Sequence, residues 1–123
     1  MSMTEREFTL AEARALMPEV LAKTAEIVRL RADLAELALD LRTEGSSPFG
    51  GIAEAKAYEA RVEEHLTWFS EQGIEVKGLA PLLIDFPAWI DGRSVRLCWL
   101  EGDSELAWYH LSELGFVGRR PLN

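Results

Sequence analysis

Cysteine is almost absent from this sequence. Cys98 is the single one among 123 residues, so the chain cannot form an internal disulfide. An unpaired cysteine is typical of proteins in a reducing compartment. The opening residues, 1–7, lack the apolar core of a signal peptide, and no apolar run approaches the length of a membrane span. We therefore expect a cytoplasmic protein that does not enter a membrane.

Positive charge is also scarce. Lys and Arg together number 13 against 21 Asp and Glu, which gives a formal net charge of −8. An acidic surface repels phosphate backbones and anionic lipids, and no stripe of Lys and Arg overrides that repulsion. We therefore expect no nucleic-acid partner and no binding to anionic membranes.

Common catalytic and cofactor motifs are missing. The chain has no Cys-x-x-Cys pair, no His-Glu-x-x-His helix, no nucleophile elbow and no dinucleotide-binding glycine fingerprint. Residues 115–121 combine two glycines with two arginines, which suits a carboxylate or phosphate group. That segment lacks the Lys-Ser/Thr ending of a P-loop, and a tail that pairs Arg119 with a core acid is the favoured interpretation. We expect no cofactor and no metal, and the balance is against an enzyme.

What the sequence does contain is a long helical pattern over residues 8–73. Thr9 and Glu12 have the spacing of a capping box, which predicts the start of the first helix. Pro18 cannot donate to the helical hydrogen-bond ladder, so a kink or a restart is expected there. From Pro18 the pattern runs unbroken to about Thr43.

The apolar residues of this helix recur at steps of three and four, as in a coiled-coil-like seam. The two series of the seam are Ala13, Val20, Ile27, Leu34, Leu41 and Leu16, Lys23, Leu30, Leu37, in which Lys23 is the one interruption. A Gly- and Ser-rich loop follows, and a second helix is predicted over residues 52–72, ending at Gly73. The two segments predict a helical hairpin.

The remainder, residues 74–123, predicts a three- to four-stranded antiparallel meander with a C-terminal tail. Predicted strands cover residues 74–76, 82–86, 94–100 and 105–110, and residues 87–90 follow the second of them before the next turn. Asp91-Gly92 is a strong two-residue hairpin signal, and a second tight turn is predicted at Gly102-Asp103. The whole chain is therefore expected to be one α+β domain, with the helical hairpin packed on the sheet.

Tight turns also fix which side chains share a face of the sheet. The predicted register pairs Phe86 with Leu97 and Val95 with His110. One face is then almost wholly apolar and should cover the helices: Ile84, Phe86, Ala88, Val95, Leu97, Trp99, Leu106, Trp108 and His110. The opposite face is mixed, with Asp85 opposite Cys98 and Arg96 diagonal to it, and it includes Glu105. Such a mixed face often marks a contact surface.

Two stretches of the sequence resemble a known family. The first is Phe8-Thr9-Leu10-Ala11-Glu12-Ala13 with Leu16, Pro18 and Glu19. The second is Asp85-Phe86-Pro87-Ala88, Asp91-Gly92-Arg93, Val95, Leu97-Cys98-Trp99, Gly102, Glu105, His110, Gly115-Phe116-Val117-Gly118-Arg119 and Pro121-Leu122. Together they are similar to a bacterial family of small proteins, the domain of unknown function numbered twenty-two-oh-three. The resemblance covers nearly the whole chain and implies no activity.

Four residues are candidates for ligand binding: His110, Asp85, Glu105 and Arg119. His110 is either a core histidine or a general base or metal ligand. Asp85 lies in an apolar strand, and a buried carboxylate needs a partner, so it either pairs with Arg96 or Arg119 or has a chemical role. On the predicted register His110 points away from both acids, and no pairing of Cys98 with a histidine is expected.

Two functions remain open. The first is a non-catalytic interaction module that forms a homodimer and binds a protein partner. The first helix is longer than the second, so Leu16 and Val20 have no partner in the hairpin. They are expected to pack either on another chain, as in a homodimer, or on the sheet of the same chain. The alternative is a small-ligand- or metal-binding protein, or an enzyme, that uses the His, Asp, Glu and Arg candidates. An open pocket at these residues would favour the second function, and a sealed, fully paired network would favour a structural role.

Overall fold

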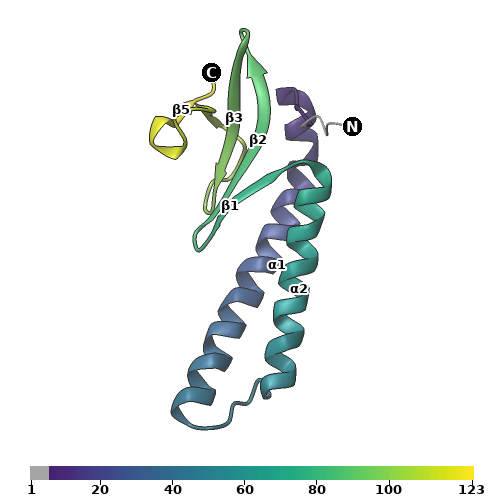
Figure 1. The fold of residues 1–123 in the computed structure, drawn as a ribbon, viewed down its shortest axis with the longest axis vertical. Helices are drawn as coiled ribbons and strands as arrows, with labels where there is room; N and C mark the ends of the chain where they lie inside the picture. Colours follow the sequence, from purple (N-terminus) through teal and green to yellow (C-terminus); the bar gives the residue numbers. More distant parts are fainter. Residues whose placement is uncertain (1–5) are drawn as a thin grey trace. The chain divides into compact units, whose positions relative to one another are not determined.

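The computed structural model describes residues 6–123, in which two long helices precede an antiparallel sheet (Figure 1). The elements are α1 (Leu10–Thr43), α2 (Ile52–Gln72), β1 (Glu75–Leu79), β2 (Leu82–Ile90), β3 (Arg93–Leu100), β4 (Trp108–Leu111), the 3₁₀-helix η1 (Phe116–Gly118) and β5 (Arg120–Pro121). The α+β class and the helical hairpin are confirmed. The sheet has five strands rather than three or four.

The start of α1 follows from local hydrogen bonds. The backbone N–H of Glu12 donates to the Thr9 hydroxyl over 3.0 Å, and the Thr9 N–H donates to the Glu12 carboxylate over 2.8 Å. These two bonds form the predicted capping box and satisfy amides that have no partner within the helix. The helix continues through Pro18 without restarting. Neither α1 nor α2 has an apolar stretch of the length that a membrane crossing requires.

The chain forms two compact units, Leu21–Trp68 and the segments on either side of it. Within Leu21–Trp68 the seam residues Ile27, Leu30 and Leu37 are buried. The two helices of this unit are also joined by polar contacts. Arg61 donates to Glu26 over 2.6 Å, and the Lys23 ammonium lies 5.3 Å from the centre of the Trp68 ring. The interruption of the seam at Lys23 thus has a specific partner through a cation–π contact.

The strands follow one another in the order β1-β2-β3-β4-β5, and all neighbours are antiparallel. Asp91 and Gly92 both have positive φ, 51° and 76°, as the two central positions of a tight hairpin turn require. This turn pairs Phe86 with Leu97, so the predicted register between β2 and β3 is confirmed.

The predicted register between β3 and β4 is wrong by one residue. Val95 pairs with Leu111, and Arg96 pairs with His110. The chain does turn where expected, since the Asp103 N–H donates to the Leu100 carbonyl, but residues 104–107 form a loop instead of a strand. A slip of one residue moves every side chain of a strand to the other face. His110 and Trp108 therefore lie on the face opposite Trp99.

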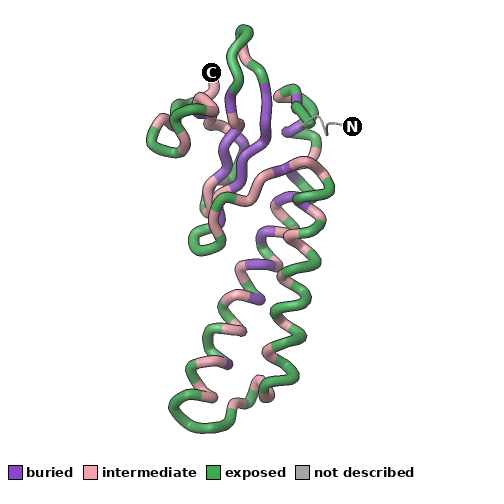
Figure 2. The backbone as a smooth tube through the Cα atoms, in the orientation of Figure 1, coloured by how far each residue is buried: buried purple, intermediate pink, exposed green. Residues whose placement is uncertain are grey.

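One face of the sheet is covered by the first turns of α1, within the unit that holds both ends of the chain. Phe8 packs edge to face on Phe86 at 5.3 Å, and its N–H donates to the Pro87 carbonyl. Ala13, Met17 and Val20 are buried, and burial in the sheet concentrates on β2 and β3 (Figure 2). Val20 is therefore covered within one chain, as the intrachain alternative expected, and it offers no contact to a second copy.

Candidate functional site

The other face of the sheet carries a row of side chains that crosses four strands. Glu75 of β1 pairs with Asp85 of β2, Asp85 with Cys98 of β3, and Cys98 with Trp108 of β4. Because paired residues of antiparallel strands share a face, these side chains lie in one line across the sheet. His110 lies two residues further along β4, opposite Arg96 and on the same face.

His110 meets Asp85 and Cys98 in a cluster that excludes solvent. Its Nε2 is 3.2 Å from Asp85 Oδ2, and its Nδ1 is 2.9 Å from the Leu111 carbonyl oxygen. A carbonyl only accepts, so Nδ1 carries the proton and donates it. Asp85 and His110 are each 3% exposed, and Cys98 is fully buried. We call Asp85, Cys98 and His110 the polar cluster.

Burial determines the ionisation of the cluster. It raises the pKa of Asp85, while the charge and the hydrogen bond of His110 act in the opposite direction. Burial and the nearby Asp85 carboxyl raise the pKa of the Cys98 thiol to about 12. A thiol with such a pKa is protonated at neutral pH, so Cys98 is a poor nucleophile in this state.

One oxygen of the cluster is left over. Asp85 Oδ2 bonds to His110, whereas Asp85 Oδ1 is buried without a hydrogen-bond partner. Burying an unpaired polar atom costs free energy, and such atoms are rare in folded proteins. The expected pairing of Asp85 with Arg96 or Arg119 is wrong, because the partner is His110.

Arg96 instead connects the sheet to the end of β4. It donates to both oxygens of Glu75, at 2.9 and 3.4 Å, and to the hydroxyl of Ser112 at 2.8 Å. Ser112 also bonds to Ser94 over 2.7 Å. Although partial burial acts to raise the pKa of Glu75, the hydrogen bond and the charge of Arg96 dominate and lower it.

Glu75→Gln is therefore expected to show a pH-dependent loss of stability. A lowered pKa means that Glu75 contributes stability above its ordinary value of 4.5, and that this contribution disappears as the pH falls through the folded-state pKa. Urea unfolding at pH 7 should show a loss of about 1 kcal/mol, because the pair is partly exposed. The difference from the wild type should shrink below pH 4.5; a constant difference would contradict the ionic role.

Arg119 borders the polar cluster from the segment between β4 and β5. Its guanidinium bonds to Asp103 and lies 4.6 Å from the Trp108 ring and 5.5 Å from the Phe116 ring. It also acts on the Cys98 thiol, in the direction of a lower pKa. Its Nε is buried without a hydrogen-bond partner. Arg119 was predicted to pair with a core acid; it does pair with an acid, but that acid is Asp103 in the turn after β3 and not a core residue.

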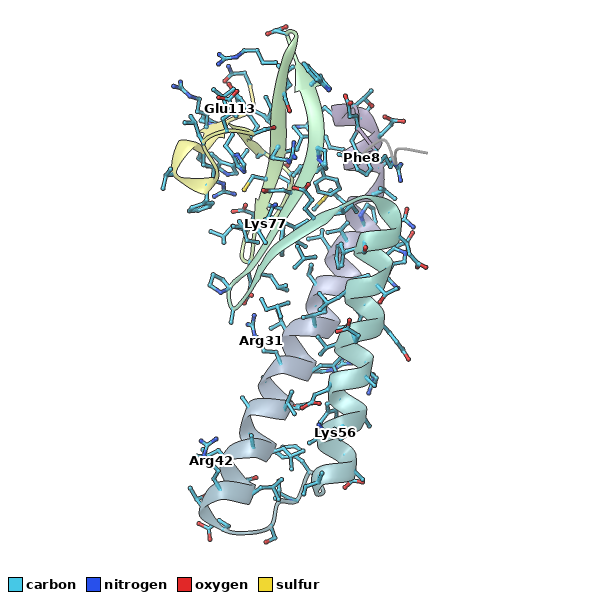
Figure 3. All side chains as sticks on the ribbon, in the orientation of Figure 1. Phe8, Arg31, Arg42, Lys56, Lys77 and Glu113 are labelled. Carbon is cyan, nitrogen blue, oxygen red and sulfur yellow. The ribbon has the colours of Figure 1, made fainter. Side chains whose placement is uncertain are left out.

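Residues 112–119, which we call the C-terminal loop, lie on the side of the sheet away from Phe8, as the positions of Glu113 and Phe8 show (Figure 3). A Cβ added at Gly118 would lie 2.8 Å from the Leu114 Cβ, which is closer than side chains pack. The loop thus needs glycine at this position to fold back on itself.

Three of the four predicted site residues come together and one does not. His110 and Asp85 are in contact, and Arg119 adjoins them. Glu105 is exposed in the loop before β4 and lies outside the cluster. Cys98, which was expected to have no histidine near it, is the member that sequence reasoning missed. The sequence did contain a signal for the longer loop that brings His110 to this face: the polar run of residues 101–105 exceeds what a two-residue turn needs.

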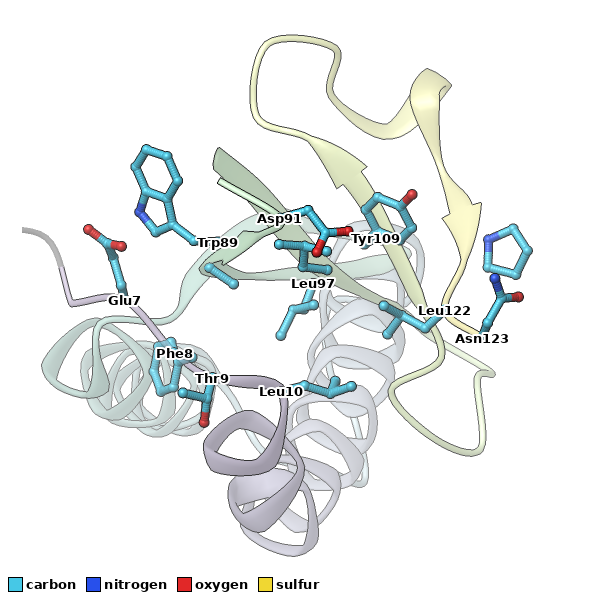
Figure 4. A pocket seen from close by; sticks show the side chains of 13 residues that line it. Glu7, Phe8, Thr9, Leu10, Trp89, Asp91, Leu97, Tyr109, Leu122 and Asn123 are labelled. Atoms are coloured by element: carbon cyan, nitrogen blue, oxygen red, sulfur yellow. The ribbon is translucent and has the colours of Figure 1, made fainter. Parts of the chain in front are cut away.

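The helix-covered face has a cavity of about 600 Å³ beside the first turn of α1 (Figure 4). Aromatic side chains such as Phe8, Trp89 and Tyr109 line it. Its charged lining residues are the acids Glu7 and Asp91, and among the described residues no His, Cys, Lys or Arg lines it. None of the predicted site residues opens into this cavity.

A family model described as "Uncharacterized conserved protein (DUF2203)" matches residues 6–122, nearly the whole chain. The match confirms the resemblance carried by the two stretches of the sequence. No curated protein and no solved structure matches the chain.

Proposed function

The chain belongs to this uncharacterised family, whose description names no activity, and from its own structure we propose that it is a non-catalytic, homodimeric interaction module. The proposal places the contact at the C-terminal loop. It also includes a cytoplasmic location, which the single unpaired Cys98 supports.

The closure of the polar cluster supports a non-catalytic role. A substrate has to reach the groups that act on it, and Asp85, Cys98 and His110 are shielded from solvent. The protonated state of Cys98 removes the strongest nucleophile of the chain. The cavity beside α1 holds none of the four predicted site residues among its lining residues.

The observation that carries the proposal is an exposed apolar segment in the C-terminal loop. Val117 is 93% exposed, and Leu114 and Phe116 are also exposed. The loop is nevertheless held in place, because Arg119 bonds to Asp103 and lies against both Trp108 and Phe116. Adjacent apolar side chains on an ordered loop are typical of a protein contact site.

The edges of the sheet are unsuited to pairing with another strand. β1 has an irregularity between Val76 and Gly78 and carries the charged Lys77, and both features discourage strand addition. β5 has only two residues, and Pro121 has no N–H to donate. Side-chain packing at the C-terminal loop is therefore the expected mode of contact.

A second copy of the chain is the partner that suits this loop. A twofold interface brings the same patch of both copies together, so each charge needs an opposite charge on the same patch. Exposed Glu113 and Arg120 flank the apolar segment in the sequence and carry opposite signs. An apolar contact also limits the repulsion between two chains of charge −8.

Val117→Asp should abolish the dimer, because two carboxylates would enter the apolar contact. Light scattering on the full chain at micromolar to millimolar concentration should give about twice the monomer mass of 13.8 kDa for the wild type, and the monomer mass for the variant. The matched control is Ile52→Asp, at a residue that is 74% exposed outside the loop, and it should remain dimeric. A wild type that stays monomeric throughout would overturn the homodimer.

A further inference from the structure

We propose that the polar cluster is a binding site for a divalent metal ion of the zinc class, with Asp85, Cys98 and His110 as its protein ligands. The inference is independent of the proposed dimer, because the cluster and the exposed apolar segment use different side chains.

The spacing of the candidate ligand atoms suits a single ion. One atom from each residue, the Cys98 sulfur, a nitrogen of His110 and an oxygen of Asp85, lies within 4.8 Å of the other two. Zinc binds nitrogen and oxygen at about 2.0–2.1 Å in tetrahedral sites, which separates these ligand atoms by about 3.3 Å. The observed distance from His110 Nε2 to Asp85 Oδ2 is 3.2 Å. Small movements of the sulfur and of the carboxylate would complete the three-ligand arrangement.

The orientation of the imidazole is the one that a metal ligand needs. Its Nδ1 donates to the Leu111 carbonyl over 2.9 Å, and this bond holds the ring while Nε2 points to Asp85. Metal-binding histidines almost always donate their second ring N–H to a carbonyl or a carboxylate in this way. The bond comes from the backbone of β4 itself, so the strand fixes the direction of the ligand.

The unpartnered oxygen of Asp85 is an independent sign of a missing ligand. Asp85 is 3% exposed, yet its Oδ1 has no hydrogen bond. In a core that serves only for packing, a buried carboxylate oxygen would have a hydrogen-bond partner, or an apolar side chain would occupy its position. Metal coordination would use the carboxylate as a ligand and remove the uncompensated burial.

Charge balance also favours the ion. A divalent cation bound to a thiolate, a carboxylate and a neutral imidazole has no net charge, which suits a site without solvent. The combination of sulfur, imidazole and carboxylate selects zinc-class ions over magnesium and calcium, which prefer oxygen ligands alone. Three protein ligands leave the fourth position of a tetrahedral ion without a protein ligand. The buried Arg119 Nε–H, which has no partner, borders the cluster.

Metal content of the full chain without a histidine tag tests the proposal. Because the cluster is closed, the protein is unfolded in denaturant with a chelator, then refolded with one equivalent of zinc and desalted. The expected result is about one zinc ion per chain by mass spectrometry. Refolding with cobalt(II) instead should give the near-ultraviolet absorption of a cobalt–thiolate bond, which reports coordination by Cys98.

Three variants separate the site from adventitious binding. Cys98→Ala and His110→Gln should each lose the bound metal, and Cys98→Ala should also lose the cobalt–thiolate absorption. The matched control Glu105→Gln removes a predicted site residue that lies outside the cluster, so it should bind like the wild type. Circular dichroism establishes which variants fold. The site would be overturned by a folded Cys98→Ala variant that retains full zinc, or by a wild type that contains no zinc after refolding with one equivalent of it. Either result leaves the dimer test unaffected.

Discussion

Replacing His110 by leucine is expected to lower the free energy of unfolding of the metal-free protein by about 3–5 kcal/mol, a typical loss when one partner of a buried pair is removed. His110 is the hydrogen-bond partner of Asp85, whose other oxygen already has none. The substitution therefore leaves Asp85 buried without the charge and the hydrogen bond of His110. Urea unfolding at pH 7 in the presence of a chelator measures the effect without any contribution from a bound ion.

The second half of this test is the double variant Asp85→Leu/His110→Leu. Removing both partners also removes the unpaired carboxylate, so the double variant should be more stable than His110→Leu alone. A double variant that is less stable than the single one would show that the cluster stabilises the fold by packing and not by the pair.

The pH dependence of the stability of His110→Leu shows in which direction the ionisation of Asp85 changes the free energy of unfolding. Burial raises the pKa of Asp85 in the folded state above its ordinary value of 3.8. Between the ordinary pKa and the raised folded-state pKa, the folded state binds more protons than the unfolded state. The contribution of this group to stability therefore falls as the pH rises through that window. Without His110 the carboxyl lacks the group that lowers its pKa, so the deficit of the variant should shrink as the pH is lowered toward 4.

Phe86→Ala is expected to destabilise the protein to a similar degree, by about 3–5 kcal/mol. Phe86 is fully buried in β2 and packs edge to face on Phe8 at 5.3 Å, so the substitution leaves a cavity between the sheet and the start of α1. Denaturant unfolding should show a lower midpoint with an unchanged slope.

The matched control is the same substitution at an exposed phenylalanine. Phe116 is 42% exposed and contributes one face to the contact with Arg119, so Phe116→Ala should cost less than about 1 kcal/mol. Equal losses at Phe86 and Phe116 would contradict the assignment of the core to the helix-covered face.

Features that depend on neighbouring residues were predictable from the sequence. The capping box of Thr9 and Glu12 needs only a spacing of three residues, and it starts α1 as predicted. The turn at Asp91-Gly92 needs only two residues that accept positive φ, and it sets the register of β2 against β3. In both cases the physical cause lies within a few residues of its effect.

The candidate site was harder to predict because it depends on the length of one loop. Leu106, Trp108 and His110 alternate with Ala107, Tyr109 and Leu111, and both sets contain large apolar side chains, so hydrophobicity does not decide which set faces the helices. The loop of residues 104–107 decides it by adding residues to the turn. His110 then faces Asp85 and Cys98, which the shorter turn would have kept apart.

The division of the chain has a consequence for synthesis on the ribosome. The unit that contains the sheet is built from both ends of the sequence, while Leu21–Trp68 is inserted between them. Phe8 leaves the ribosome long before β2, and until β2 follows it lacks its partner Phe86. The inserted hairpin makes its contacts between nearer neighbours and is expected to form first. Nascent chains that stop after Trp68 would therefore hold a folded hairpin beside an apolar N-terminal segment still awaiting its strand, the stage at which this protein most needs protection from aggregation.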